Sequence, residues 1–251
     1  MKYDLIVQGP LDNNRLNIIY SKVNFEFVGK VIYSDCTGNI DLALPNLIVI
    51  NHIDPGENKP RYSKPLNIDR YLVGVRSSLN AVEQKYVLII RSDINLSFDK
   101  ITPLLNLDML NVLDVTTKKF WLKDKWKFHF CDWLYFCEYE KIFNMINSTN
   151  YNDLPCTFLD SLFPCSPEYL LTYNYLESNG LINKNILESI NVIYSKDIDL
   201  TCSKKGYEVI PFGVNKVYGL TKDDIYEGEI RASRKSKIYQ FYLKLANKIC
   251  K

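Results

Sequence analysis

The chain has 251 residues, a net charge of +2 at neutral pH and hydrophobic residues at 47% of its positions. This length fits one large domain or two small ones, and the composition excludes a disordered chain, a collagen-like repeat and a coiled-coil rod. Seven cysteines without a C-x-x-C pair are typical of a reduced, cytoplasmic chain. No apolar run is long enough to predict a membrane span.

Short apolar runs predict the strands of the first half, and each run stops at a polar or turn-forming residue. We expect strands at 5–7, 30–34, 47–50 and 86–90, and helices at about 16–22 and 68–85. Strands that are apolar on both faces and alternate with helices predict an α/β fold, in which a mostly parallel sheet is flanked by helices. Ligands of such sheets bind beyond the carboxyl ends of the strands, where Gln8-Gly9-Pro10, Ser34-Asp35 and Arg91-Ser92-Asp93 fall.

The second half is less regular, with a dense aromatic segment between Trp121 and Phe136. We expect strands at 111–117 and 127–136, a helix at 139–146, and a helix that starts at Pro167 and ends before Gly180. Weaker elements are expected at 185–194 and 207–211, and a last helix at 236–249.

Several well-known catalytic motifs are absent from the sequence. It contains no Walker A motif, no G-x-G-x-x-G, no H-E-x-x-H and no G-x-S-x-G, and its histidines are His52 and His129 alone. These absences weaken protease, lipase, kinase and dinucleotide oxidoreductase interpretations.

An acid at a strand end remains as a candidate. Asp93 follows five apolar residues closely and stands where a ligand would meet the sheet. A carboxylate there could coordinate Mg²⁺ or Mn²⁺, which would hold a diphosphate and neutralise a leaving group. The structural alternative is that Asp93 caps a turn or pairs with Arg91.

Six short motifs between about residues 4 and 180 resemble, in their order and spacing, the WavE family of lipopolysaccharide-synthesis proteins. They are Gln8-Gly9-Pro10, Asp54-Pro55-Gly56, Asn67-x-x-Arg70, Ile90-Arg91-Ser92-Asp93, Cys131-Asp132-Trp133-Leu134-Tyr135-Phe136 and Pro167-Glu168-x-Leu170. The resemblance implies a single GT-A-like, Rossmann-like domain at 1–230, with a nucleotide-sugar half at 1–110 and an acceptor half at 111–230. It also implies a glycosyltransferase that builds bacterial surface polysaccharide from a nucleotide sugar.

The chain departs from that family at two places. Cys137 stands where a Gly usually follows the aromatic run, and Arg91-Ser92-Asp93 replaces Arg-Thr-Asp. The Asp-x-Asp metal signature of GT-A enzymes is missing, since Arg91 holds its first position. Either a divalent ion on Asp93 or Arg91 itself could therefore face the diphosphate, because a planar guanidinium suits phosphate oxygens.

The donor site is expected at Gln8, Gly9, Pro10, Asn67, Arg70 and Arg91. Gln8 and the Gly9-Pro10 backbone would border the nucleotide, because Gly lets the chain approach a ligand closely. Asn67 and Arg70 open a helix whose positive end could bind a diphosphate or a sugar hydroxyl. The structural alternatives are a tight turn, an N-cap and a surface arginine.

Asp132 and Glu168 are the expected catalytic residues. Asp132 lies among aromatic residues and suits a general base that takes a proton from an acceptor hydroxyl. Glu168 could hold a sugar hydroxyl or serve as the alternative base, and His129 could be a second metal ligand. A buried Asp bonded to backbone amides, a first-turn helix Glu and a core His are the structural alternatives.

The segment 231–251 has seven Lys and Arg residues and no acid, which leaves a net charge of −5 for the rest of the chain. Its apolar residues recur at helical spacing, so it predicts a basic amphipathic helix that lies on an anionic membrane surface or packs on its own domain. Without a binding motif, nucleic acid is not an expected partner.

We therefore expect a glycosyltransferase that moves a sugar from a nucleotide sugar to a bacterial surface glycan, in lipopolysaccharide or capsule. The acceptor would be a glycan or a lipid-linked glycan, and the place of action the cytoplasm or the inner face of the cytoplasmic membrane. Two alternatives stay open. One is a transferase of a phospho-alditol or nucleotidyl group on a similar fold, and the other is a non-catalytic glycan-binding or assembly protein.

Overall fold

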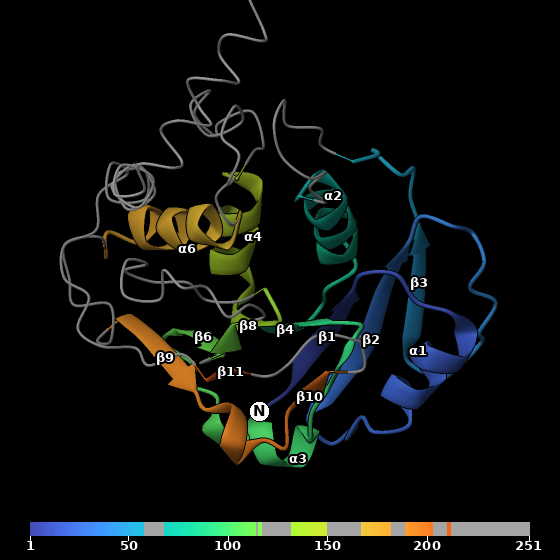
Figure 1. Ribbon diagram of the computed structural model, residues 1–251, viewed down its shortest axis with the longest axis horizontal. Coiled ribbons are helices and arrows are strands. Elements are labelled where there is room, and N and C mark those ends of the chain that lie inside the picture. The colour runs from blue at the N-terminus through green and yellow to red at the C-terminus, as the bar shows by residue number, and fades with distance from the viewer. Residues whose placement is uncertain are drawn as a thin grey trace, which may run out of the picture.

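The computed structural model describes residues 1–57, 68–113, 115–116, 132–149, 167–181, 189–202 and 210–211. Its centre is a seven-stranded sheet with the order β3-β2-β1-β4-β8-β6-β9 (Figure 1). The strands are β1 (Tyr3–Gln8), β2 (Val28–Asp35), β3 (Leu47–Asn51), β4 (Tyr86–Arg91), β6 (Leu110–Leu113), β8 (Leu134–Glu138) and β9 (Ile190–Ile193).

Within this sheet β8 alone runs against its neighbours. β1 pairs in parallel with β2 and β4, β2 with β3, and β6 with β9, whereas β8 is antiparallel to both β4 and β6. The carboxyl end of β4 therefore lies beside the amino end of β8. The expected fold class, α/β with a mostly parallel Rossmann-like sheet flanked by helices, is confirmed.

Helices cover both faces of the sheet (Figure 1). Side chains of α2 (Ile68–Leu79), α4 (Tyr139–Asn147) and α6 (Pro167–Ser178) share one apolar core with the sheet. Side chains of α1 (Asn13–Tyr20) and α3 (Phe98–Ile101) share a second core on the other face. The central strands are buried from both sides, which explains why their sequences are apolar runs without alternation.

The first two helices differ from the sequence prediction at their ends. α1 begins at Asn13 because the Asp12 side chain accepts a hydrogen bond from the Arg15 backbone N–H and caps the helix. α2 ends at Leu79 and not near Lys85. Its apolar spacing continues to Val82, but the Asp4 carboxylate binds the N–H groups of Glu83 and Gln84 and holds them outside the helix.

The structure corrects two of the strands expected in the second half and adds a small ladder that was not expected. The single strand expected at 111–117 is two strands, β6 and β7 (Val115–Thr116), and β7 pairs with β11 (Ile210–Pro211). Another small ladder joins β5 (Ile94–Asn95) to β10 (Thr201–Cys202). β8 begins only at Leu134, so Asp132 and Trp133 form the turn before the strand and are not part of it.

The remaining elements agree with expectation or lie outside the described residues. Helices α4 and α6 are confirmed, and short 3₁₀ turns occupy Thr102–Leu104 and Ser195–Asp197. The segment 127–131 and the basic segment 231–251 lie outside the described residues, so their expected strand and helix stay predictions. Within the part of the chain that the structure describes, no helix has the length and apolarity to cross a membrane.

Candidate functional site

Three neighbouring strands bring the predicted residues to one edge of the sheet. Gln8, the last residue of β1, lies opposite Arg91, the last residue of β4. The Arg91 backbone N–H donates to the Trp133 carbonyl at 3.1 Å, which fixes the turn before β8 against the end of β4. The 8–10 segment, the 91–93 turn and Asp132 therefore meet at the edge where ligands of parallel sheets bind.

At this edge Arg91 joins two carboxylates, and we call Arg91, Asp93 and Asp132 the arginine cluster. Arg91 Nε and Nη2 donate to Asp93 Oδ1 and Oδ2 at 3.0 and 2.6 Å, a two-point contact that occupies both carboxylate oxygens. Arg91 Nη1 donates to Asp132 Oδ1 at 3.2 Å. The sequence placed Asp93 and Asp132 in different roles, and the structure brings both onto one guanidinium.

The arginine cluster is partly exposed, with 21%, 18% and 21% of the side chains of Arg91, Asp93 and Asp132 accessible. Burial opposes the charge on Arg91, but the charges and hydrogen bonds of Asp132 and Asp93 outweigh it and raise the pKa of the guanidinium. Arg91 thus keeps its positive charge at every pH where the protein is folded, and it stands at a surface that a ligand can reach.

The 8–10 segment is packed directly against the 91–93 turn. The Ser92 N–H donates to the Gln8 carbonyl at 2.8 Å, and its hydroxyl donates to the Pro10 carbonyl at 3.1 Å. Gly9 has a φ of +102°, and a Cβ on it would lie 2.9 Å from the Ser92 hydroxyl. Close packing on Ser92 therefore explains why a glycine occupies position 9. The expected contact of this segment with a nucleotide stays a prediction.

Arg15 of α1 binds the turn that follows β4, and the sequence did not identify it as a site residue. Its guanidinium donates to the carbonyls of Ser92 and Ile94, both at 2.8 Å, and to Asn95 Oδ1 at 2.9 Å. No motif marks Arg15, which lies in a polar stretch 77 residues before Ser92. The only local signal is its place in the first turn of the helix that follows β1.

Arg70 lies in the first turn of α2 and engages acids of the loop after β3. Its Nε and Nη2 donate to Asp54 Oδ1 and Oδ2 at 2.8 and 2.7 Å, and its Nη1 to Glu57 at 3.4 Å. The hydrogen bonds from Arg70 lower the pKa of Asp54 to about 2. The structure thus places Arg70 in an exposed ion pair, and Asn67 lies outside the described residues.

The ends of β2 and β3 carry a second polar pair, which joins Ser34, expected at the ligand-binding edge, to His52, which was not expected there. His52 Nδ1 lies 2.8 Å from the Ser34 hydroxyl. The neighbouring Asp35 is buried and accepts hydrogen bonds from the backbone of Thr37, Asn39 and Ile40. Asp35 therefore shapes the loop after β2, which is a structural role.

The structure describes no side-chain geometry for three further predicted positions. His129 and Cys131 lie outside the described residues. Glu168 lies in the first turn of α6, where the backbone alone is described. Its role as a sugar ligand or alternative base stays a prediction.

The donor atoms around Asp93 do not fit a divalent cation in this arrangement. Mg²⁺ needs carboxylate oxygens at about 2.0–2.1 Å, but both Asp93 oxygens already accept hydrogen bonds from the Arg91 guanidinium. Within the described ranges, no three His, Cys, Asp or Glu side chains are grouped as metal ligands. The described residues around Asp93 therefore do not support the Mg²⁺ or Mn²⁺ expected from the sequence, which stays a prediction.

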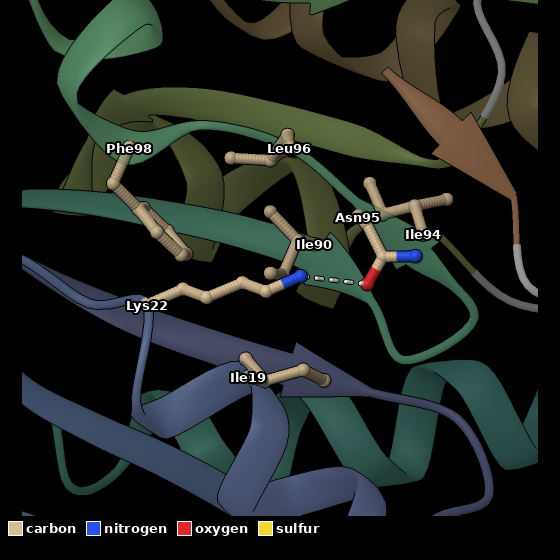
Figure 2. A pocket seen from close by; sticks show the side chains of 7 residues that line it. All are labelled: Ile19, Lys22, Ile90, Ile94, Asn95, Leu96 and Phe98. Atoms are coloured by element: carbon tan, nitrogen blue, oxygen red, sulfur yellow. Dashed lines mark hydrogen bonds between the residues drawn. The ribbon is translucent and has the colours of Figure 1, made fainter. Parts of the chain in front are cut away.

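A small hollow lies behind the turn that Arg15 holds, between α1 and the 94–98 segment (Figure 2). Ile19, Ile90, Leu96 and Phe98 line it, and Lys22 reaches across it to Asn95 Oδ1 at 3.4 Å. Its volume of about 210 Å³ includes open solvent, so it is a shallow hollow and not an enclosed ligand pocket. The hollow is mainly apolar and its lining includes no member of the arginine cluster, so it is not the candidate site.

Comparison with known proteins leaves the function to be argued from the residues. No family model matches the chain, and no curated protein matches it. Among solved structures, it is similar to 2-C-methyl-D-erythritol 4-phosphate cytidylyltransferase from Thermus thermophilus, with 10% identity and a TM-score of 0.46 over 92% of this chain and 99% of that one. A likeness of this size carries no argument about activity, and the resemblance to the WavE family stays a prediction.

Proposed function

We propose that the protein is a glycosyltransferase that binds a nucleotide-sugar donor at the edge formed by the ends of β1 and β4 and the start of β8. The observation that carries the proposal is the arginine cluster, in which side chains from two strand ends meet beside a glycine turn. A ligand-binding edge of a parallel sheet with a permanent cation and two acids suits a phosphorylated, hydroxyl-rich substrate.

The chain's own residues divide the reaction between them. The backbone of 8–10 borders the nucleotide, and Asp132 accepts the proton of an acceptor hydroxyl. The oxygen of that hydroxyl then bonds to the anomeric carbon, while the bond from that carbon to the diphosphate oxygen breaks. The nucleoside diphosphate leaves with the electron pair, and the negative charge that develops on it is stabilised by the Arg91 guanidinium.

The donor site is tested by a thermal-shift panel of UDP, GDP, CDP, CMP and their sugars. A ligand at a hundred times its Kd stabilises the folded state by about 2.7 kcal/mol, which raises Tm measurably. A shift with one nucleoside diphosphate and its sugar supports the proposal and identifies the base. A shift with CMP alone favours transfer of a phospho-alditol or nucleotidyl group, and no shift with any ligand contradicts both.

The role of Asp132 is tested with Asp132→Asn, which keeps the shape of the side chain and removes the base. We expect a turnover rate lower by about 10²–10⁴-fold and a much smaller loss of donor affinity, because Asp93 still holds Arg91 at two points. An equal loss of donor affinity would make Asp132 a binding residue. Asp108→Asn is the control, because Asp108 is an exposed acid before β6.

We also propose that the acceptor is a bacterial glycan or a lipid-linked glycan, and that segment 231–251 brings the enzyme to an anionic membrane. The support is its seven basic residues without an acid and its helical apolar spacing. Removal of 231–251 should lower retention on vesicles that contain phosphatidylglycerol and leave nucleotide binding intact. Unchanged retention would return the segment to a packing role.

A further inference from the structure

We propose that the donor site works without a divalent metal, because Asp93, the carboxylate expected to hold one, is already bound at both oxygens by the guanidinium of Arg91. The inference rests on the proposed function, since it concerns the same site. It concerns the 91–93 turn, whose first position is an arginine where enzymes with an Asp-x-Asp pair have an acid.

Asp93 is committed to Arg91 and not to a cation. Both of its oxygens accept hydrogen bonds from Arg91, at 3.0 and 2.6 Å. A metal on Asp93 would have to share these oxygens with the guanidinium or displace it, and would lie beside a second positive charge. Two cations within a few ångströms repel each other strongly at a partly buried site, so the arrangement disfavours metal capture.

Arg91 has donors left for a ligand. A guanidinium carries five N–H groups, and three of those on Arg91 donate to Asp93 and Asp132. The other two, one on each terminal nitrogen, donate to no described residue. A planar cation with donors left on both terminal nitrogens can donate to phosphate oxygens.

The guanidinium is also fixed in place without a metal. Asp93 and Asp132 hold it from two directions, and the turn behind it is bound by Arg15 through Ser92, Ile94 and Asn95. A cation that is already oriented needs no reorganisation when charge develops on the leaving diphosphate. The carboxylates thus orient Arg91 toward the phosphate, which is a positioning role for Asp93.

The experiment measures binding of UDP, GDP and CDP by calorimetry, once with EDTA and once with Mn²⁺. We expect at least one diphosphate to bind with a Kd that agrees within about twofold between the two conditions. Arg91→Lys and Arg91→Gln should weaken that binding by about tenfold or more, because the lysine keeps the charge but loses the paired donors. Arg76→Lys is the matched control, since Arg76 is a half-buried arginine of α2 that donates to Ile146 and Thr149.

A second variant tests the converse, that a metal site forms when the arginine is replaced by an acid. Arg91→Asp creates the missing Asp-x-Asp pair together with Asp93. We expect this variant to bind Mn²⁺ in electron paramagnetic resonance titrations, in which the wild-type protein does not. Circular dichroism and Tm check that each variant folds. If Arg91→Asp fails to fold, the wild-type comparison with EDTA and the Arg91→Lys variant decide the question.

The outcomes separate this inference from the proposed function. Binding that requires Mn²⁺, or binding unchanged in Arg91→Gln, overturns the metal-free site and leaves the glycosyltransferase proposal standing. Absence of binding in both conditions contradicts the proposed function itself. Binding in EDTA that depends on Arg91 supports both.

Discussion

Asp4 and Asp93 are acids at opposite ends of the two central strands, and their surroundings differ in kind. Asp4 stands at the amino end of β1, fully buried, and accepts hydrogen bonds from the backbone N–H groups of Lys30, Glu83 and Gln84. Asp93 follows β4 at the carboxyl end, is partly exposed and is held by a side chain, Arg91.

These different surroundings indicate a structural role for Asp4 and a role in ligand binding for Asp93. A carboxylate that is saturated by backbone amides joins strands and loops and has no capacity for a ligand. A carboxylate that is held by an arginine at an exposed edge can orient that arginine toward a substrate. We therefore expect substitutions at the amino end to change stability, and substitutions at the carboxyl end to change binding.

The largest effect on stability is expected for Asp4→Ala. The variant leaves three part-buried backbone N–H groups without their acceptor, at about 1 kcal/mol or more each, so the free energy of unfolding should fall by about 3 kcal/mol or more. Urea denaturation measures this loss. The exposed helix cap Asp12→Ala is the control and should lose about 1 kcal/mol. A loss for Asp4→Ala no larger than that of the control would remove the distinction between the two ends.

Gly9→Ala tests the close packing of the two loops at the carboxyl end. The φ of +102° and the 2.9 Å approach to the Ser92 hydroxyl are both unfavourable for alanine. We expect a loss of about 1–3 kcal/mol in the free energy of unfolding, together with weaker nucleotide binding.

The double variant Gly9→Ala with Ser92→Ala separates the two causes. Removal of the hydroxyl should restore the part due to the contact, and the part due to φ should remain. Additive losses in the double-mutant cycle would show that the two residues do not interact.

Arg15→Lys should have a smaller effect, because the lysine keeps the charge but cannot reach all three acceptors on the 92–95 turn. We expect a loss of about 1–2 kcal/mol in stability and a higher Kd for the nucleotide. The control is Lys22→Arg, since Lys22 contacts the same Asn95 oxygen at 3.4 Å. Nucleotide affinity equal to that of the control would mean that Arg15 does not position the site.

The exposed pair of Asp54 and Arg70 should give the smallest effect, visible only in acid. Hydrogen bonds from Arg70 and, to a smaller degree, from the Gly56 backbone lower the pKa of Asp54 in the folded state from 3.8 to about 2. A lowered folded pKa stabilises the protein above the unfolded pKa, and this stabilisation is lost as the pH falls through that range. Tm of the wild type should exceed that of Arg70→Gln above about pH 4, and the two curves should converge near pH 2. Parallel curves would show that the pair adds nothing to stability.

Much of the fold could be predicted from the sequence, because the buried strands appear in it as continuous apolar runs that end at turn residues. The errors lie where distant contacts override the local pattern. Helix α2 ends before its apolar spacing does, because Asp4 binds the N–H groups of Glu83 and Gln84. β8 runs antiparallel to β4, a pairing that no local signal in its aromatic segment indicates.

The candidate site was predicted in part. Turn residues at strand ends identified Gln8, Gly9, Arg91 and Asp93, because their chemistry follows from position. The pairing of Asp132 with Arg91 could not be predicted, because it depends on β8 lying beside β4 across 41 residues of sequence. Arg15 was missed for the same reason, since its acceptors are the backbone of a distant turn.

The most direct test of the contrast between the two ends is hydrogen exchange by mass spectrometry, with the nucleoside diphosphate that gives the largest thermal shift. The account predicts slower exchange on binding in peptides that cover 8–15 and 91–96, and no change in peptides that cover 27–30 and 82–85 around Asp4. Protection around Asp4 without protection at 91–96 would contradict the assignment of the carboxyl edge as the donor site.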